Sequence, residues 1–163
     1  MIIVALDPSG NWGDKEGWGT TGLALYEGGN VSLHEIKSSD YSSHEEYWNA
    51  VITHKGMKQA DYIVIEGYKL YNHAGRNAQM QSNSDMPTSQ LIGALKMQAF
   101  HNKIPAVIQY ASDVKTRWSD EVLTNLGILE SGNKFKGKST NAHKRDALRH
   151  LCHFKKYKLK DGK

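Results

Sequence analysis

Three acidic residues, far apart in the sequence, lie where a folded chain could bring carboxylates together. Asp7 ends an apolar run over residues 1–6, Glu66 ends a β-branched run over 62–65, and Asp146 lies in a helix-like segment over 141–151. Carboxylate oxygens are the ligands that Mg²⁺ and Mn²⁺ prefer. Acids at two strand ends and on a late helix are therefore typical of a divalent-metal nuclease.

A fourth candidate is His143, which precedes Asp146 by three residues and would share its face of a helix. A neutral imidazole can bind manganese and can also move protons. In a two-metal site, ions about 3.5–4 Å apart activate the attacking water and stabilise the leaving oxygen. We expect Mg²⁺ or Mn²⁺, two ions per site, with the metal-binding and catalytic residues Asp7, Glu66, His143 and Asp146.

Each of these residues also has a plain structural interpretation. Asp7 before Pro8 could start a turn by accepting from nearby backbone amides. Glu66 could be a surface charge at a strand end, and Asp146, among lysine and arginine, could form a helical ion pair of little energetic weight. His143 and His150 could be half-buried helix residues.

Length and composition indicate one domain over 1–163, with a basic C-terminal tail from about residue 155. Charged residues make up 23% of the chain, which is ordinary for a globular protein. The first apolar run is too short to span a bilayer or act as a signal sequence, so we expect a cytoplasmic protein with no membrane partner. The single Cys152 is interpreted as a small buried hydrophobe.

Positive charge is concentrated at the end of the chain. Residues 134–163 hold eleven Lys or Arg against two Asp, whereas residues 1–133 hold ten against fifteen Asp or Glu. This segregation favours a polyanionic partner that lies on a basic flank while the acids hold metal. A solvated helix face with a frayed tail is the alternative.

Hydrophobic periodicity predicts an α/β chain. Strands are expected over 1–7, 20–27, 31–37, 61–66 and 106–110, and helices over 42–56, 87–101, 119–126 and 140–156. Glycines 132 and 137 with the neighbouring lysines indicate a flexible basic loop. Three antiparallel strands followed by helix, strand, helix and strand is an α/β order.

Short motifs in this order resemble the RuvC family of Holliday junction resolvases, within the ribonuclease H-like superfamily. They are Leu6-Asp7-Pro8 before Thr21-Gly22, then Ile65-Glu66, the looser Gln90-Leu91-Ile92-Gly93-Ala94-Leu95, Tyr110 before Val114-Lys115, and His143 to Asp146 before Ala147-Leu148. The resemblance implies a mixed five-stranded sheet, three strands antiparallel and then two parallel, flanked by helices. It also implies resolution of branched DNA in recombination and repair, leaving 5′-phosphates and 3′-hydroxyls.

The same resemblance implies a homodimer, because two symmetric cuts need two active sites. The helix carrying Met86, Leu91, Leu95 and Met97 is the expected source of the interface. Two features depart from the family: the long loop over 10–19, which suggests added substrate or dimer contacts, and His143 in place of Asp. The compact, divergent form would suit a phage.

The aromatic and cationic residues after Glu66 suggest contacts to unpaired bases and phosphates. The expected DNA-binding residues are Tyr68, Lys69, Tyr71, Arg76, Lys115, Arg117, Lys134, Lys136 and Lys138. The segment over 73–86 is expected to be a loop that orders on DNA. Three other functions remain open: a ribonuclease H-like enzyme acting on RNA or hybrids, a YqgF-like nuclease, and a branched-DNA binding protein with impaired catalysis.

Overall fold

A computed structural model describes residues 1–13, 17–68 and 86–159 of the chain. In this structure the strands are β1 (Ile2–Asp7), β2 (Thr20–Glu27), β3 (Asn30–Lys37), β4 (Tyr62–Gly67), β5 (Ala106–Tyr110), β6 (Lys134–Phe135) and β7 (Lys138–Ser139). The helices are η1 (Ser38–Asp40), α1 (His44–Ile52), α2 (Lys55–Gln59), α4 (Pro87–His101), α5 (Ala111–Val114), α6 (Asp120–Asn125) and α7 (Ala142–Tyr157).

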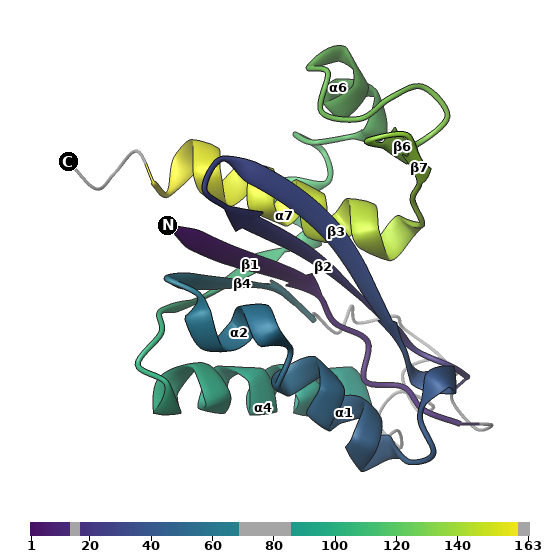
Figure 1. Cartoon of the computed structure of the whole chain (residues 1–163), viewed down its shortest axis with the longest axis vertical. Coiled ribbons are helices and arrows are strands. Elements are labelled where there is room, and N and C mark those ends of the chain that lie inside the picture. Colours follow the sequence, from purple (N-terminus) through teal and green to yellow (C-terminus); the bar gives the residue numbers. More distant parts are fainter. Residues whose placement is uncertain (14–16, 69–85, 160–163) are drawn as a thin grey trace, which may run out of the picture.

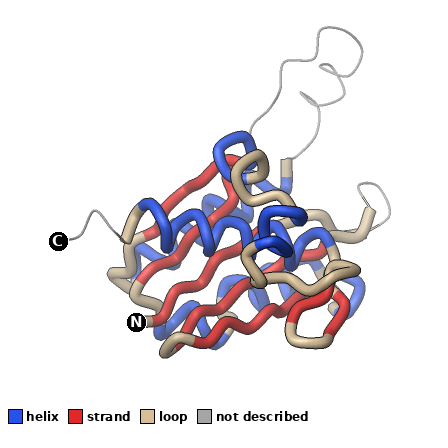
Figure 2. The backbone as a smooth tube through the Cα atoms, turned by 90° about the horizontal axis from the view of Figure 1, so that it is seen from above, coloured by secondary structure: helices blue, strands red, loops and turns tan. Residues whose placement is uncertain are grey.

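The centre of the fold is a five-stranded sheet in the order β3-β2-β1-β4-β5. Neighbouring strands among β3, β2 and β1 are antiparallel, whereas β4 is parallel to both β1 and β5. Helix α7 lies across one face and helices α1, α2 and α4 cover the other (Figure 1). Seen from above, the strands lie side by side as a continuous twisted layer, with helices in front of it and behind it (Figure 2). The predicted mixed sheet is confirmed.

Alternation along the strands divides the core in two. On β1, Ile3 and Ala5 pack under α7, whereas Val4 and Leu6 pack against the helices on the other face. Successive side chains of a strand point to opposite faces, so an apolar run of this kind must be buried on both sides. The same alternation assigns Asp7, one step beyond Leu6, to the α7 face.

Side-chain caps fix where the main helices begin. Ser43 accepts from the backbone N–H of Glu46 at the start of α1, and Asn141 accepts from that of Lys144 at the start of α7. Each bond satisfies an amide that would otherwise lack a partner in the first turn. Asn141 is thus part of the reason that α7 starts one residue before His143.

Three sequence-based expectations change in the structure. The helix expected over 42–56 is two helices: α1 ends at Ile52 with Thr53 as its C-cap, and His54 caps α2 by accepting from the N–H of Gly56. The expected flexible basic loop contains the β6–β7 hairpin. Leu91 and Leu95 are fully buried in the chain's own core, so these two residues cannot form a dimer interface.

The described parts of the long loop after β1 pack on their own chain. The carbonyl of Gly10 accepts from Trp48 Nε1 at 3.0 Å, and the N–H of Gly10 donates to Thr88 at 3.0 Å. Trp12 packs edge-on to Trp18, which is 56% exposed. Among the described residues, no helix has both the length and the apolar character needed to cross a membrane.

Tyr47 connects this loop to the sheet, and its hydroxyl is the basis of a first prediction. The hydroxyl donates to the Ser9 carbonyl at 2.6 Å and lies 2.8 Å from the buried Thr21 hydroxyl. Replacing Tyr47 by Phe leaves both groups short of a partner, so we expect the free energy of unfolding to fall by about 1–3 kcal/mol.

The difference in unfolding free energy between the wild type and the Tyr47→Phe variant should depend on pH. Burial raises the pKa of Tyr47 to about 12, against about 10 for an unfolded tyrosine. The wild-type hydroxyl therefore contributes fully below pH 10 and loses its contribution as pH rises towards 12. Urea titrations at pH 8 and pH 11.5 should show the gap between the two proteins narrowing. A gap that stays constant would contradict these contacts.

Candidate metal centre

Strand register places the first two acids side by side. Strands β1 and β4 are parallel, with Leu6 opposite Ile65, so Asp7 and Glu66 lie next to each other at the C-terminal ends of these strands. Val64 packs under α7, and Glu66, two residues on, has the same parity and faces the same helix. Both carboxylates therefore point towards α7.

Gly22 allows α7 to approach closely enough to bring the third acid. Gly22 pairs with Asp7 across β1 and β2, and a Cβ atom there would lie 2.1 Å from the carbonyl oxygen of His143. A side chain at this position would push the first turn of α7 away from the sheet. Without one, His143 and Asp146 lie over the ends of β1 and β4.

The three carboxylates converge on one point. Each of Asp7, Glu66 and Asp146 offers an oxygen, and these oxygens lie within 4.8 Å of one another. Asp146 is buried, with 8% of its surface exposed, whereas Asp7 and Glu66 are half-buried. His143 Nδ1 lies 2.8 Å from Asp7 Oδ2, so the imidazole belongs to the same cluster.

Cationic groups surround these carboxylates. Lys115 Nζ lies 2.8 Å from Asp146 and 3.5 Å from Glu66. Arg149 pairs with Asp146 and also with Asp120, which holds it from the other side. His150 Nε2 lies 3.0 Å from Glu66, and Nδ1 of the same ring lies 3.0 Å from Gln109 Oε1.

These contacts shift the pKa values of the acids in different directions. Burial raises the pKa of Asp7 above its ordinary value and outweighs the opposing hydrogen bond to His143, and the charges of Glu66 and Asp146 act in the same upward direction. For Glu66, burial also acts upwards, but the hydrogen bond to His150 and the charge of Lys115 bring its pKa below the ordinary value. The bond to Asp7 raises the pKa of His143.

A divalent cation fits this group of residues. The converging atoms are three hard carboxylate oxygens, ligands that Mg²⁺ and Mn²⁺ prefer, and the imidazole of His143 contacts one of these carboxylates. The upward pKa shift of Asp7 reports the cost of gathering negative charge in a buried place, and a bound cation would relieve that cost. The ring contact through Nδ1 leaves Nε2 of His143 for metal or proton chemistry.

The expected DNA-binding residues are distributed over several places. Lys115 lies within the metal centre itself. Lys134, Lys136 and Lys138 lie on the β6–β7 hairpin, beside the first turns of α7 (Figure 1), and Lys136 donates to the Val31 carbonyl at 2.8 Å. Exposed Tyr68 follows β4, and exposed Arg117 lies near Tyr157. Lys69, Tyr71 and Arg76 lie outside the described residues.

Two members of the site were not identified from the sequence. The sequence favours a half-buried helix position for His150, yet this residue is fully buried against Glu66. Gln109, which orients His150, belongs to none of the motifs. Parity could have indicated Gln109, because it lies two residues after Val107 on β5 and shares its face of the sheet.

Similarity to known proteins is found in structure and not in sequence. No family model matches the chain, and no curated protein matches it. Thermus thermophilus RuvC in complex with a Holliday junction substrate superposes with a TM-score of 0.64 and 14% identity, covering 98% of this chain and 95% of that chain.

Two other solved structures extend this result. A second structure of Thermus thermophilus RuvC gives a TM-score of 0.64 and 15% identity over 99% of this chain and 97% of that one. The fowlpox virus Holliday junction resolvase gives a TM-score of 0.53 and 13% identity over 96% of this chain and 99% of that one. At such identities the comparison shows a shared fold: the chain has the ribonuclease H-like, RuvC-like architecture expected from its motifs.

The close approach at Gly22 can be tested by a single methyl group. We expect Gly22→Ala to lower the free energy of unfolding by about 1–3 kcal/mol, the usual cost of overpacking. In metal-free protein, displacement of α7 should also move the pKa of His143 back towards 6.5, measured by NMR titration of the ring.

The matched control for this variant is Gly93→Ala on α4. A Cβ at Gly93 meets nothing within 4 Å, and alanine is the better helix former, so this variant should be neutral or slightly more stable. If the two variants unfold alike and the His143 titration is unchanged in both, Gly22 does not set the position of α7.

Proposed function

We propose that the chain is a divergent RuvC-family endonuclease that hydrolyses phosphodiesters of branched DNA, above all four-way junctions, leaving 5′-phosphates and 3′-hydroxyls. The observation that carries the proposal is the convergence of Asp7, Glu66 and Asp146 at one edge of a RuvC-like sheet. The basic segment over 134–163 supports a polyanionic substrate, because its +9 balance favours binding along a phosphate backbone.

The residues of the centre would divide the work. Two Mg²⁺ or Mn²⁺ ions held by Asp7, Glu66, Asp146 and His143 would supply an activated water and stabilise the leaving oxygen. Arg149 and His150 hold Asp146 and Glu66 in place from behind. Lys115, which is 43% exposed, can turn from these carboxylates to a substrate phosphate and so offset its negative charge.

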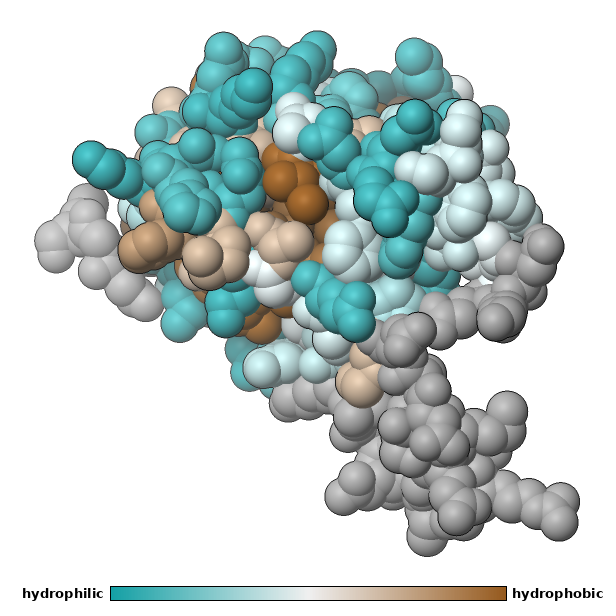
Figure 3. Space-filling view, turned by 90° about the horizontal axis from the view of Figure 1, so that it is seen from below, coloured by the Kyte–Doolittle hydropathy of each residue, from teal (hydrophilic) through white to brown (hydrophobic). Residues whose placement is uncertain are grey.

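A homodimer is part of the same proposal, because two symmetric cuts require two such centres. Met97 and Phe100 form an exposed apolar stripe on α4, with Met97 55% and Phe100 74% exposed. Apolar surface lies among hydrophilic side chains on the face seen from below (Figure 3). We assign the interface to this stripe, in place of the buried Leu91 and Leu95.

The activity is tested with labelled four-way, three-way and linear duplex DNA and an RNA–DNA hybrid, each with Mg²⁺, Mn²⁺ or EDTA. We expect metal-dependent cleavage of the four-way junction above the other substrates. Asp7→Asn should lower the cleavage rate at least about 100-fold, because one transition-state stabilising group is lost, with junction binding retained.

The control for that variant is Asp61→Asn, which makes the same change at the opposite end of the sheet, where Asp61 accepts from the N–H of Ile2. It should cleave at the wild-type rate. Unchanged cleavage by Asp7→Asn would rule out the metal centre described above. Preference for the hybrid would indicate an RNA-directed enzyme, and metal-independent binding without cleavage would indicate a branched-DNA binding protein.

The interface is tested by sedimentation equilibrium over a range of protein concentrations. Phe100→Glu places a charge on the most exposed residue of the apolar stripe, so we expect it to weaken dimerisation at least tenfold. Gln59→Glu adds the same charge on the exposed face of α2 and should leave the dimer intact. A wild-type protein that is monomeric at all concentrations would contradict the proposed dimer.

A further inference from the structure

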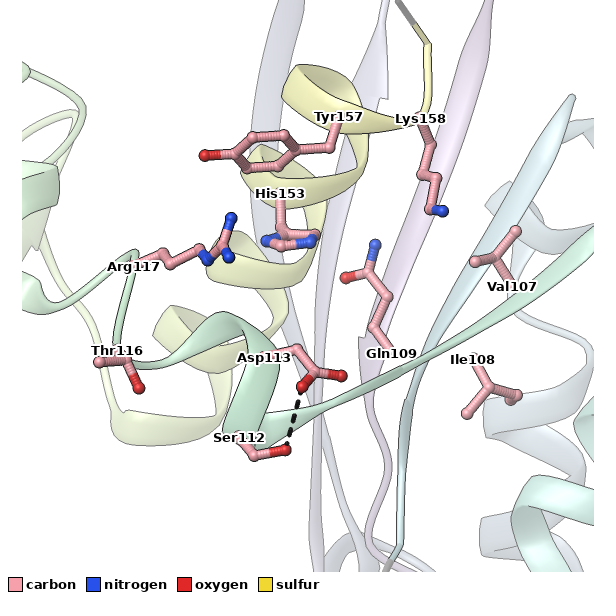
Figure 4. Close-up of a pocket in the computed structure, with 10 residues that line it drawn as sticks. All are labelled: Val107, Ile108, Gln109, Ser112, Asp113, Thr116, Arg117, His153, Tyr157 and Lys158. Carbon is pink, nitrogen blue, oxygen red and sulfur yellow. Dashed lines mark hydrogen bonds between the residues drawn. The ribbon is translucent and has the colours of Figure 1, made fainter. Parts of the chain in front are cut away.

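A cavity separate from the carboxylate cluster lies on the α7 face of the sheet, beside the outer strand β5. Its volume is about 710 Å³, within the usual range for sites that bind small molecules. Its walls come from β5, from residues 112–117 and from the last turns of α7 (Figure 4). Its lining holds none of the three carboxylates, and Gln109 connects it to the metal centre through His150.

The walls of this cavity carry positive charge from two sides. The guanidinium of Arg117 and the ammonium of Lys158 both extend towards its centre (Figure 4). Asp113 is the single acidic side chain in the lining, and its carboxylate accepts from Ser112 at 3.3 Å. Within the described part of the chain, no ion pair involves Arg117 or Lys158, in contrast to Arg145 and Arg149, which both pair with Asp120.

The floor of the cavity contains polar atoms without partners. Gln109 is only 6% exposed; its Oε1 lies 3.0 Å from His150 Nδ1, but its Nε2 has no partner among the described residues. That nitrogen is directed into the space between His153 and Lys158 (Figure 4). The buried Nδ1 of His153 also lacks a partner in the described structure. A buried amide N–H is costly to leave unpaired, so the Gln109 side chain would be satisfied by an acceptor on a ligand.

The charge and shape of the cavity select the chemistry of that ligand. Guanidinium, ammonium and amide donors around one space match the oxygens of a phosphate, and a metal ion is disfavoured by the same charges. Burial lowers the pKa of His153, and the charges of Arg117 and His150 add to this, which indicates a positive local field. The volume exceeds that of a bare phosphate, and Tyr157 and Val107 supply aromatic and apolar surface for a sugar or base.

We propose that this cavity binds the phosphate group of a nucleotide, with Arg117, Lys158 and Gln109 as its donors. The nucleotide can be free or part of a DNA strand, and in the second case the inference rests on the proposed function. A single DNA strand could reach both places, because Lys115 in the metal centre and Arg117 in the cavity are two residues apart in the protein sequence.

The first test uses thymidine 5′-monophosphate, thymidine and inorganic phosphate as probes of the metal-free protein. Binding is read from the NMR signals of the Gln109 side-chain amide and from the rise in Tm. We expect the monophosphate to bind and thymidine to be at least tenfold weaker. The double variant Arg117→Gln and Lys158→Gln should bind the monophosphate at least tenfold more weakly than the wild type.

The matched control is Lys58→Gln combined with Lys103→Gln, which removes the same charge from exposed positions on α2 and after α4. It should bind the monophosphate as the wild type does. Equal weakening in both double variants would show a general charge effect and overturn the proposal.

The second test measures four-way junction binding in EDTA, in the Asp7→Asn background, over a series of salt concentrations. Loss of two phosphate contacts should lower the slope of log affinity against log salt by up to about 1.8. Weaker junction binding in the cavity variant but not in its control assigns the phosphate to a DNA strand. Monophosphate binding without that effect assigns it to a free nucleotide.

Absence of both effects would overturn the proposal. The result is separable from the proposed function: wild-type junction cleavage with neither effect refutes the cavity alone, whereas monophosphate binding without any cleavage refutes the nuclease alone.

Discussion

The contact between the bare backbone of Gly22 and the first turn of α7 determines the rest of the centre. The sheet by itself supplies two acids, and the third belongs to a helix more than 130 residues after Asp7 in the chain. A backbone-to-backbone approach fixes that helix more tightly than side-chain packing could, because no rotamer can relax it. The apolar residues of α7, such as Leu148 and Leu151, then hold the helix down along its length.

Basic side chains pack around the carboxylate cluster. His143, Lys115, Arg149 and His150 each contact one or two of the acids. Buried like charges would otherwise oppose folding. These partners differ in exposure: His143 and Lys115 are each 43% exposed, whereas Arg149 and His150 are buried deeper. The outer pair can therefore yield to a ligand while the inner pair stays in place.

Much of the fold could be predicted from the sequence, since period-two alternation and apolar runs located all five central strands within about one residue. The three acids and the one imidazole named from motifs also lie where α7 meets the ends of β1 and β4. What could not be predicted depends on tertiary contacts. The burial of His150 follows from its pairing with Gln109, the break between α1 and α2 follows from a cap at His54, and the burial of Leu91 and Leu95 depends on which face of α4 meets the sheet.

Helix α7 carries residues of the proposed metal centre and also a wall of the cavity at β5. His143, Asp146, His150, His153 and Tyr157 follow one another at alternate steps of three and four residues, which makes a polar stripe along a single face of α7. At 1.5 Å per residue, Asp146 and Tyr157 are separated by about 16 Å. Duplex DNA rises about 3.4 Å per base pair, so a strand engaging both places would span about five base pairs. Helix α7 would then set a fixed distance along the substrate between the point of cleavage and the contact in the cavity.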